Sequence, residues 1–334
     1  MTDFKVTRQE FLAGLGSLAL GGLALGDPLA AFGVEAGGPG STDLAKLPLR
    51  LQRTECLKNP IFQTRSLALD SQDRLLLAGD GGVALLGPGG VPLKTFAEGS
   101  PATSAAVDEE GLVYVGRRTR IEVFDPNGKP VASWGREGKG DGELRYVTDI
   151  TVVGHVAYVA DAGNRRVTRF AVDGDYISDL RGFNLPSAYF DCVLDPEGNL
   201  LVANTAEHRI ETYGSDGEKQ GEWGKYGFAP DGFCGCCNPT HIAVFPDGKV
   251  ATSEKGVPRI KVHDSKGTLL AYLSPEDLGL RASQKDLDPV SESPEGPLPC
   301  HDGWPGMPMA VDSMGRLVVS LPDRGEICYF ELAS

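Results

Sequence analysis

The residues of this chain that are best suited to chemistry are its cysteines and the histidines beside them. The sequence contains seven cysteines, and three of them fall in the short segment FCGCCNPTH at residues 233–241. Cys300 is followed directly by His301, and Cys192 stands in an apolar stretch. Thiolates are the preferred ligands of iron–sulfur clusters and Cu(I), and zinc takes both thiolates and imidazoles. The residue types therefore indicate a soft-metal site, provided that the fold brings these segments together.

The segment 233–241 is better suited to an iron–sulfur cluster than to a single zinc ion. Four cysteines can ligate a [4Fe–4S] cluster, and Gly235 with the Asn-Pro step gives the tight backbone that such loops need. Zinc requires four ligands at fixed geometry, which adjacent cysteines meet awkwardly. The cluster ligands that we expect are Cys234, Cys236, Cys237 and Cys300. The wider set of candidate metal ligands is Cys192, Cys234, Cys236, Cys237, Cys300, His241 and His301.

The same cysteines have alternative interpretations. Exported proteins form disulfides, and here Cys236 and Cys237 can bridge each other while Cys300 pairs with Cys234 or Cys192. The cysteine count is odd, which leaves at least one thiol unpaired or bound to a ligand. Disulfides, a metal site and a set of reactive thiols all stay open at this point.

The N-terminal segment predicts export. A basic start precedes an uncharged run over residues 12–26, which is shorter than the roughly 20 residues that span a bilayer and is typical of a secretory signal. The segment TRQEFL at residues 7–12 resembles the twin-arginine export motif, with Gln9 in place of the second arginine. We expect a signal peptide over 1–31, a linker over 32–46 and a periplasmic or extracellular protein. An uncleaved membrane anchor is the alternative.

The elements that must position the cysteines belong to a repeat. Each unit has an apolar strand, a turn with Asp and Gly, a second strand, a basic residue followed by a β-branched one, and a third strand. Units open near residues 66, 104, 149, 191, 241 and 309. A period of about 40–50 residues with three or four strands is typical of a β-propeller blade. An open β-solenoid is the alternative architecture.

The repeat resembles a known family. The turns LDPEG at 194–198, FPDG at 245–248 and VDSMG at 311–315, with the pairs Arg166-Val167, Arg209-Ile210 and Arg259-Ile260, are similar to NHL repeats over residues 60–332. The resemblance implies an all-β, six-bladed β-propeller. The Cys-x-Cys-Cys-Asn-Pro segment is also similar to one in exported bacterial NHL-repeat proteins. This implies an exported propeller with a cysteine-lined site, and it implies no particular reaction.

The ring needs a closing strand. The segment 47–53 alternates between apolar and polar residues and has no other partner. We expect it to supply the outer strand of the last blade, within a propeller domain spanning 47–334, because closure also hides an edge strand. Cys56 follows this segment and Cys328 lies in the last blade. The two are expected to be either a ring-closing disulfide or two buried thiols.

Propeller geometry predicts where the cysteines gather. Inner strands run parallel to one another around the channel, so their starts lie on one face. Cys192, the segment 234–237 and the pair 300–301 each open or precede an inner strand in three consecutive units. They should therefore converge at one mouth of the channel. A long insert such as 274–308 is usually a functional lid or a disordered segment. Because it contains Cys300 and His301, we expect a lid over the mouth, with an acidic, merely solvated segment as the alternative.

The net charge and the absence of common catalytic motifs limit the classes of function that the sequence supports. A formal net charge of −14 opposes binding to nucleic acid. The sequence has no phosphate-binding loop, nucleophile elbow or HExxH motif. We expect a cysteine-ligated metal centre, iron–sulfur or else a Zn or Cu ion, that serves electron transfer or redox sensing with a protein partner. The alternatives are a disulfide-stabilised binding scaffold without chemistry and a metal-dependent hydrolase or lyase. For the latter, Asp149 and Asp191 at strand starts are candidate ligands of a hard cation, although such residues also cap turns.

Overall fold

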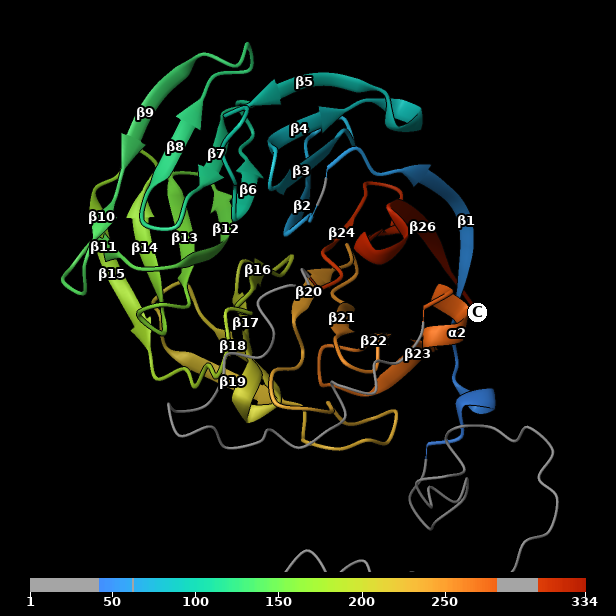
Figure 1. Cartoon of the computed structure of the whole chain (residues 1–334). Coiled ribbons are helices and arrows are strands. Elements are labelled where there is room, and N and C mark those ends of the chain that lie inside the picture. Colours follow the sequence, from blue (N-terminus) through green and yellow to red (C-terminus); the bar gives the residue numbers. More distant parts are fainter. Residues whose placement is uncertain (1–41, 62, 281–305) are drawn as a thin grey trace, which may run out of the picture. The chain divides into compact units, whose positions relative to one another are not determined.

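The computed structural model describes residues 42–61, 63–280 and 306–334. These residues form six four-stranded antiparallel sheets arranged as blades around a central channel (Figure 1). The predicted all-β, six-bladed propeller is confirmed. The expected signal peptide at 1–31, and Cys300 and His301 in the insert, lie outside the described residues. Within the described part of the chain, no helix combines the length and the apolar character needed to cross a membrane.

Each blade runs outward from the channel in chain order. Blade 1 contains β2 (Ser66–Leu69), β3 (Leu75–Gly79), β4 (Gly82–Leu86) and β5 (Pro92–Phe96). Blade 2 contains β6 (Ser104–Val107), β7 (Val113–Gly116), β8 (Ile121–Phe124) and β9 (Pro130–Trp134). Blade 3 contains β12 (Val147–Val153), β13 (Val156–Asp161), β14 (Arg166–Ala171) and β15 (Tyr176–Arg181).

The second half of the ring repeats this order. Blade 4 contains β16 (Cys192–Leu194), β17 (Leu200–Asn204), β18 (Arg209–Tyr213) and β19 (Lys219–Trp223). Blade 5 contains β20 (His241–Val244), β21 (Val250–Glu254), β22 (Arg259–His263) and β23 (Leu269–Leu273). Blade 6 contains β24 (Met309–Val311), β25 (Leu317–Leu321), β26 (Glu326–Ala333) and β1 (Arg50–Lys58). The inner strands start at or within two residues of the predicted unit openings.

Few elements lie outside the blades. The parallel pair β10 (Arg136–Glu137) and β11 (Glu143–Leu144) links blades 2 and 3, and the short helix α2 (Pro275–Leu278) follows blade 5. Single 3-10 turns are formed at η2 (Leu44–Lys46), η3 (Pro88–Gly90), η4 (Thr205–Glu207) and η5 (Pro322–Arg324).

Asp–Gly turns join the first two strands in blades 2, 4, 5 and 6. In blade 4, Asp195 Oδ1 accepts a hydrogen bond from the backbone N–H of Asn199 at 2.8 Å, and Gly198 has φ 84°. The carboxylate satisfies the turn backbone and the glycine takes the left-handed conformation that other residues resist. The repeated turn chemistry thus fixes the position of each strand pair.

Large rings fill the space between neighbouring blades. Trp134, at the end of blade 2, stacks on Phe170 of blade 3 with ring centroids 4.8 Å apart. A Cβ at Gly174 would lie 2.5 Å from the Trp134 side chain, so this turn has room only for glycine. Trp223 of blade 4 packs in the same way on His263 of blade 5, at 4.7 Å. These ring contacts pack blade 2 against blade 3 and blade 4 against blade 5.

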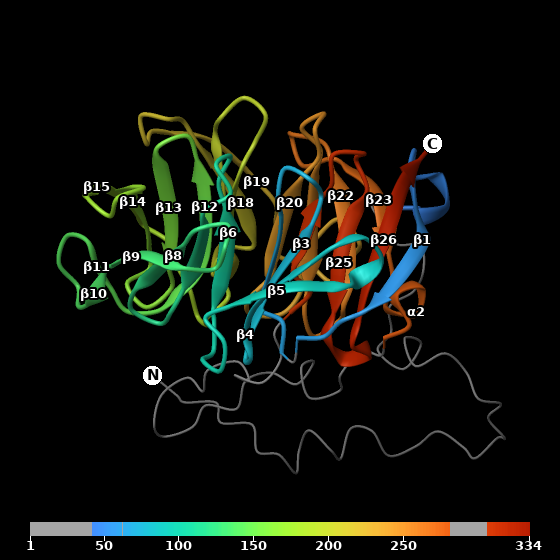
Figure 2. The same cartoon turned by 90° about the horizontal axis from the view of Figure 1, so that it is seen from above.

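The N-terminal strand closes the ring. Strand β1 pairs antiparallel with β26, with Arg50 opposite Ala333 and Lys58 opposite Glu326, and the two strands run side by side in Figure 2. The predicted outer strand of the last blade is therefore confirmed, with bounds Arg50–Lys58 rather than 47–53. Because the strand continues past residue 53, Cys56 lies directly opposite Cys328, and the two form a disulfide. The disulfide, one of the two expected alternatives, is thus the form in the structure.

Candidate functional site

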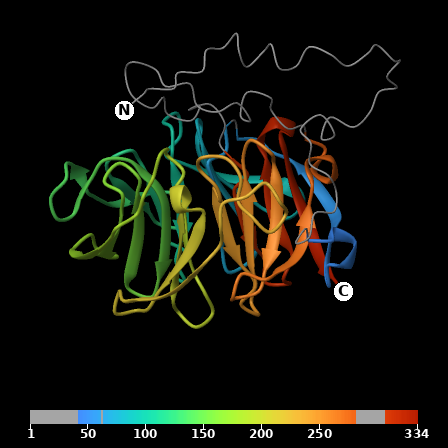
Figure 3. The same ribbon diagram turned by 90° about the horizontal axis from the view of Figure 1, so that it is seen from below.

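The central channel contains a cavity of about 340 Å³. The inner strands of all the blades line it, together with residues just before these strands. Its apolar wall includes Leu67, Ala105, Met309 and Val311. Its acidic groups and its thiol lie on the side of blades 3, 4 and 5, where Asp149, Asp191, Cys192 and His241 are found. Figure 3 shows blades 4 (yellow) and 5 (orange) next to each other.

Two carboxyl groups meet on the polar side of this cavity. Asp149, from β12, and Asp191, which precedes β16, are joined by a side-chain hydrogen bond. Burial, and next the charge of Asp191, raise the pKa of Asp149 well above its ordinary value. Asp149 therefore keeps its proton to higher pH than an ordinary aspartate does.

Blade 5 fixes the second carboxyl group. Asp191 Oδ2 accepts a hydrogen bond from the backbone N–H of Ile242 at 2.9 Å. The same oxygen lies 3.2 Å from His241 Nδ1. These two contacts hold the Asp191 carboxyl group against blade 5.

Cys192 completes a chain of polar contacts. Its thiol lies 3.7 Å from Asp149 Oδ2, and its backbone N–H is 3.3 Å from the same oxygen. Burial, followed by the charges of the two aspartates, raises the pKa of Cys192 well above its ordinary value. The sulfur is therefore held as a thiol next to the acid pair.

A second group of functional side chains is the cysteine loop, which we define as residues 232–238. The loop leads into β20 and contains Cys234, Cys236 and Cys237. The sulfur atoms of Cys236 and Cys237 are 2.9 Å apart. Cys237 is buried and Cys236 is half-buried. The loop thus places two sulfurs together within reach of the surface.

Side chains of blades 4 and 5 anchor this loop. Asn238 donates to the carbonyl of Lys255 at 3.0 Å and accepts from its N–H at 2.9 Å. His208 Nε2 lies 2.6 Å from the Gly235 carbonyl, and Arg259 donates to the Gly232 carbonyl at 3.1 Å. The backbone around both sulfurs is therefore held by groups that the repeat provides.

A buried ion cluster lies under the loop. Glu254 pairs with Arg259 and Lys261 at 2.6 Å each, and it also accepts the backbone N–H of Cys234 at 2.8 Å. Burial favours the neutral form of Glu254, but Lys261 and Arg259 outweigh it and lower the pKa of Glu254. Burial lowers the pKa of Lys261 to about 8. Burial, and next Glu254, raise the pKa of Cys234 to about 11, so this residue is held as a thiol.

The predicted ligands are thus distributed over distinct surroundings. Cys236 and Cys237 contact each other, Cys234 faces the ion cluster, and Cys192 lies in the channel. His241 faces Asp191 in the channel. Cys300 and His301 lie outside the described residues, so the expected convergence of cysteines from three blades stays a prediction. The proximity of Asp149 to Asp191 was not foreseen, although both residues were noted at strand starts.

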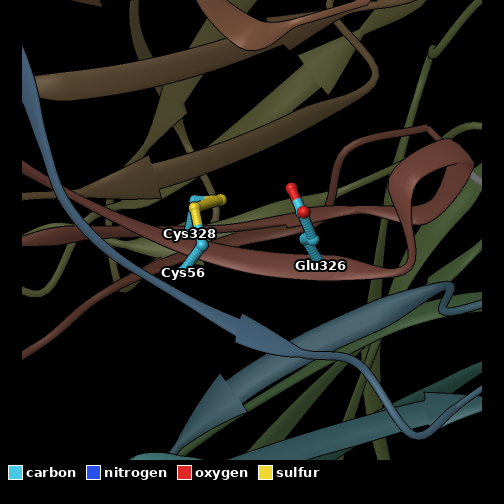
Figure 4. A group of neighbouring side chains, drawn as sticks. All are labelled: Cys56, Glu326 and Cys328. Carbon is cyan, nitrogen blue, oxygen red and sulfur yellow. A yellow bond between two sulfur atoms is a disulfide. The ribbon is translucent and has the colours of Figure 1, made fainter.

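The disulfide end of blade 6 offers no metal site of its own. Cys56, Glu326 and Cys328 place their potential ligand atoms within 4.8 Å of one another (Figure 4). Metal binding to cysteine requires the thiolate, and both sulfurs here are bonded in the disulfide. This group therefore serves as a covalent closure of the ring.

Comparison with known proteins supports the fold. No family model matches the chain, and no curated protein matches it. A solved structure described as "Streptogramin B lyase structure" is similar with a TM-score of 0.54 and 11% sequence identity, over 87% of this chain and 100% of that chain. At this identity the likeness shows the propeller fold alone. Membership of the NHL-repeat family stays a prediction.

Proposed function

We propose that this protein is an exported propeller whose cysteine loop carries a sulfur-ligated metal centre for electron transfer or redox sensing. The observation that supports this most directly is the 2.9 Å separation of the Cys236 and Cys237 sulfurs. Two adjacent sulfur donors suit a metal cluster, in which each sulfur can ligate a different metal atom, better than they suit a single zinc ion.

The anchoring of the loop supports the same proposal. A metal centre needs ligand atoms that are held in place before the metal arrives. The contacts of Asn238, His208 and Arg259 restrain the loop backbone on both sides of the sulfurs.

The proposed ligands are Cys236 and Cys237, completed by Cys300 and His301. The last two enter on sequence grounds, since they belong to the insert that precedes β24. Cys234 and Cys192 are less suited, because burial and neighbouring carboxylates raise the pKa of both thiols. When bound, an iron–sulfur centre would supply one-electron transfer.

The charge of the chain indicates the kind of partner. A net charge of −14 favours association with a basic protein surface. The half-buried Cys236 gives a partner an approach to the centre. We therefore propose a basic redox protein as the partner.

Metal analysis of the full chain, purified without oxygen, tests the proposal. We expect bound iron or zinc in the wild-type protein, with visible absorption that dithionite bleaches if the centre is iron–sulfur. Cys236→Ser and Cys237→Ser should each lose most of the metal. Cys192→Ser is the matched control and should retain it, because that thiol faces Asp149.

The absence of bound metal would contradict the proposal. A wild-type protein that retains no metal and takes up none after incubation with iron and sulfide, or with zinc, contradicts the proposal. Mass spectrometry would then show whether Cys236 and Cys237 are joined in a disulfide, as in a binding scaffold without chemistry.

A further inference from the structure

We propose that the exposed rings of Tyr226 and Phe228 form the surface on which a basic partner protein docks beside the cysteine loop, with an arginine or lysine of the partner lying on these rings. The identity of this partner as a redox protein rests on the proposed function, whereas the docking surface stands on contacts of its own.

Tyr226 and Phe228 leave their rings open to solvent to an unusual degree. Each residue is 58% exposed, whereas Tyr176, the next most exposed aromatic residue in the described part of the chain, is 38% exposed. The two rings pack edge to face, with centroids 5.9 Å apart. Exposed aromatic side chains that gather at one place are typical of interaction sites, because they supply a large contact area at low entropic cost.

The segment that carries both rings is held in place by its backbone. We call residues 225–231 the aromatic segment. The N–H of Phe233 donates to the carbonyl of Lys225 at 2.8 Å, and the N–H of Gly227 donates to the carbonyl of Phe233 at 3.0 Å. Arg259, which is buried in blade 5, donates to the carbonyl of Phe228 at 2.9 Å. Rings that are positioned in advance lose little freedom on binding, so more of the contact energy remains as affinity.

The aromatic segment is joined directly to the cysteine loop. Tyr226 forms a β-bridge with Phe233, which belongs to that loop. His208 contacts both segments, because its Nε2 lies 2.6 Å from the Gly235 carbonyl and its ring packs edge-on against Tyr226 at 5.0 Å. A protein seated on the two exposed rings would therefore lie next to the loop that contains the half-buried Cys236.

Other rings of this chain show which group suits the open ones. A lysine or arginine lies over six aromatic rings in the described part of the chain, at 4.3 to 5.9 Å from the ring centroid. These rings are Tyr146, Tyr158, Tyr189, Phe233, Tyr329 and Phe330. Among the described residues, no such cation lies over Tyr226 or Phe228. Lys225, which precedes Tyr226 in the sequence, pairs instead with Asp231 at 2.6 Å. The two rings thus remain available to a cation from another protein.

The charges near the aromatic segment also favour a basic partner. A group of interacting charges on blade 4, just before this segment, contains three carboxylates and two cations. The carboxylates are those of Glu207, Glu211 and Glu222, and the cations are Arg209 and Lys219. The net charge of −14 on the whole chain attracts a positively charged protein and repels a second copy of this chain.

Calorimetric titration of the full chain with cytochrome c, a basic haem protein, tests the docking surface. We expect saturable binding at low ionic strength that weakens as salt is added. Tyr226→Ala and Phe228→Ala should each weaken this binding by about 10-fold or more. Tyr176→Ala is the matched control, because it removes an exposed ring from blade 3, and it should bind as the wild type does.

Leucine variants separate a cation on the rings from a merely apolar contact. Tyr226→Leu and Phe228→Leu keep an apolar side chain and lose the ring, so they should bind cytochrome c nearly as weakly as the alanine variants. Wild-type affinity in the leucine variants overturns the assignment of a cation to these rings. Circular dichroism of each variant verifies that the fold is retained.

Three further outcomes overturn the proposal. The first is the absence of saturable binding to cytochrome c at low ionic strength. The second is equal affinity of the wild type and the two alanine variants. The third is a dimer of the wild type, detected by sedimentation velocity without a partner, that dissociates in the variant with both alanine substitutions, because a second copy of the chain would then cover the rings.

The metal centre and the docking surface fail separately. The wild type stripped of metal by a chelator should keep its affinity for cytochrome c, and Tyr226→Ala should keep the wild-type metal content. A protein that contains no metal but binds cytochrome c through the two rings contradicts the metal centre alone. A protein that contains metal but binds equally well without the rings contradicts the docking surface alone.

Discussion

Asp149 shows how strongly one residue depends on surroundings that come from other blades. Its raised pKa results from burial and from Asp191, which belongs to the next blade. His241, from a third blade, lies 3.2 Å from Asp191. From the sequence, an aspartate at the start of a strand is an ordinary turn residue. Its pKa rises only when the assembled ring buries it beside Asp191.

The pH dependence of stability follows from this pKa. In the unfolded chain Asp149 ionises near its ordinary value of 3.8, whereas in the folded protein it keeps its proton to higher pH. Between these two pKa values the folded state binds more protons, so the free energy of unfolding falls as pH rises. Asp149→Asn removes this term, and the variant should gain stability relative to wild type by up to about 1.4 kcal/mol per pH unit in that interval.

Urea denaturation from pH 4 to pH 8 measures this difference. Asp173→Asn is the control for loss of one carboxylate and should follow the wild-type curve. Parallel curves for the wild type and Asp149→Asn would show that the carboxyl pair holds no extra proton in the folded state.

At the scale of elements, strands β21 and β22 of blade 5 form the base of the cysteine loop. Glu254 ends β21, and Arg259 and Lys261 lie on β22. All three are buried, and they contact the backbone of Gly232 and Cys234. The hairpin thus carries charges that pair across its own two strands and also hold the neighbouring loop.

Removing one charge of this cluster should be costly. Glu254→Gln leaves two buried cations without their anion, and we expect a loss of about 3–5 kcal/mol in the free energy of unfolding. The double variant Glu254→Gln with Lys261→Met should recover part of this loss, because one cation is also removed. Denaturant unfolding measures both, and a Glu254→Gln variant as stable as the wild type would contradict a structural role for the cluster.

The hairpin also shows what the sequence can and cannot predict. The pair Arg259-Ile260 belongs to the recurring pattern of the repeat, and the turn residues predict where the strands lie. Both signals can be read because they involve residues close together in the sequence. The contact of Arg259 with the Gly232 carbonyl depends on how the cysteine loop folds back over the blade. The same holds for Asp149 and Asp191, whose contact requires two blades to be in place. Signals between neighbouring residues therefore predict the ring, whereas contacts between residues of different blades follow only from the assembled fold.

At the scale of the whole molecule, one strand determines whether the ring is closed. Strand β1 comes from the N-terminal end of the propeller and β26 from its C-terminal end, and eight residue pairs from Arg50↔Ala333 to Lys58↔Glu326 join them. The Cys56–Cys328 disulfide adds a covalent link across 272 residues. The blades between these strands cannot separate without breaking this closure.

The disulfide should therefore contribute strongly to global stability. Linking residues so far apart restricts the unfolded chain, and the loop-entropy relation gives about 5 kcal/mol for a separation of this size. The double variant Cys56→Ala with Cys328→Ala should still fold, because the strand pairing of β1 remains, but its denaturation midpoint should fall clearly. The wild type under reducing conditions should behave in the same way, and Cys192→Ala serves as the control for loss of a buried cysteine. If the double variant unfolds at the wild-type midpoint, the hydrogen bonds of β1 alone close the ring, and the disulfide has a role other than stability.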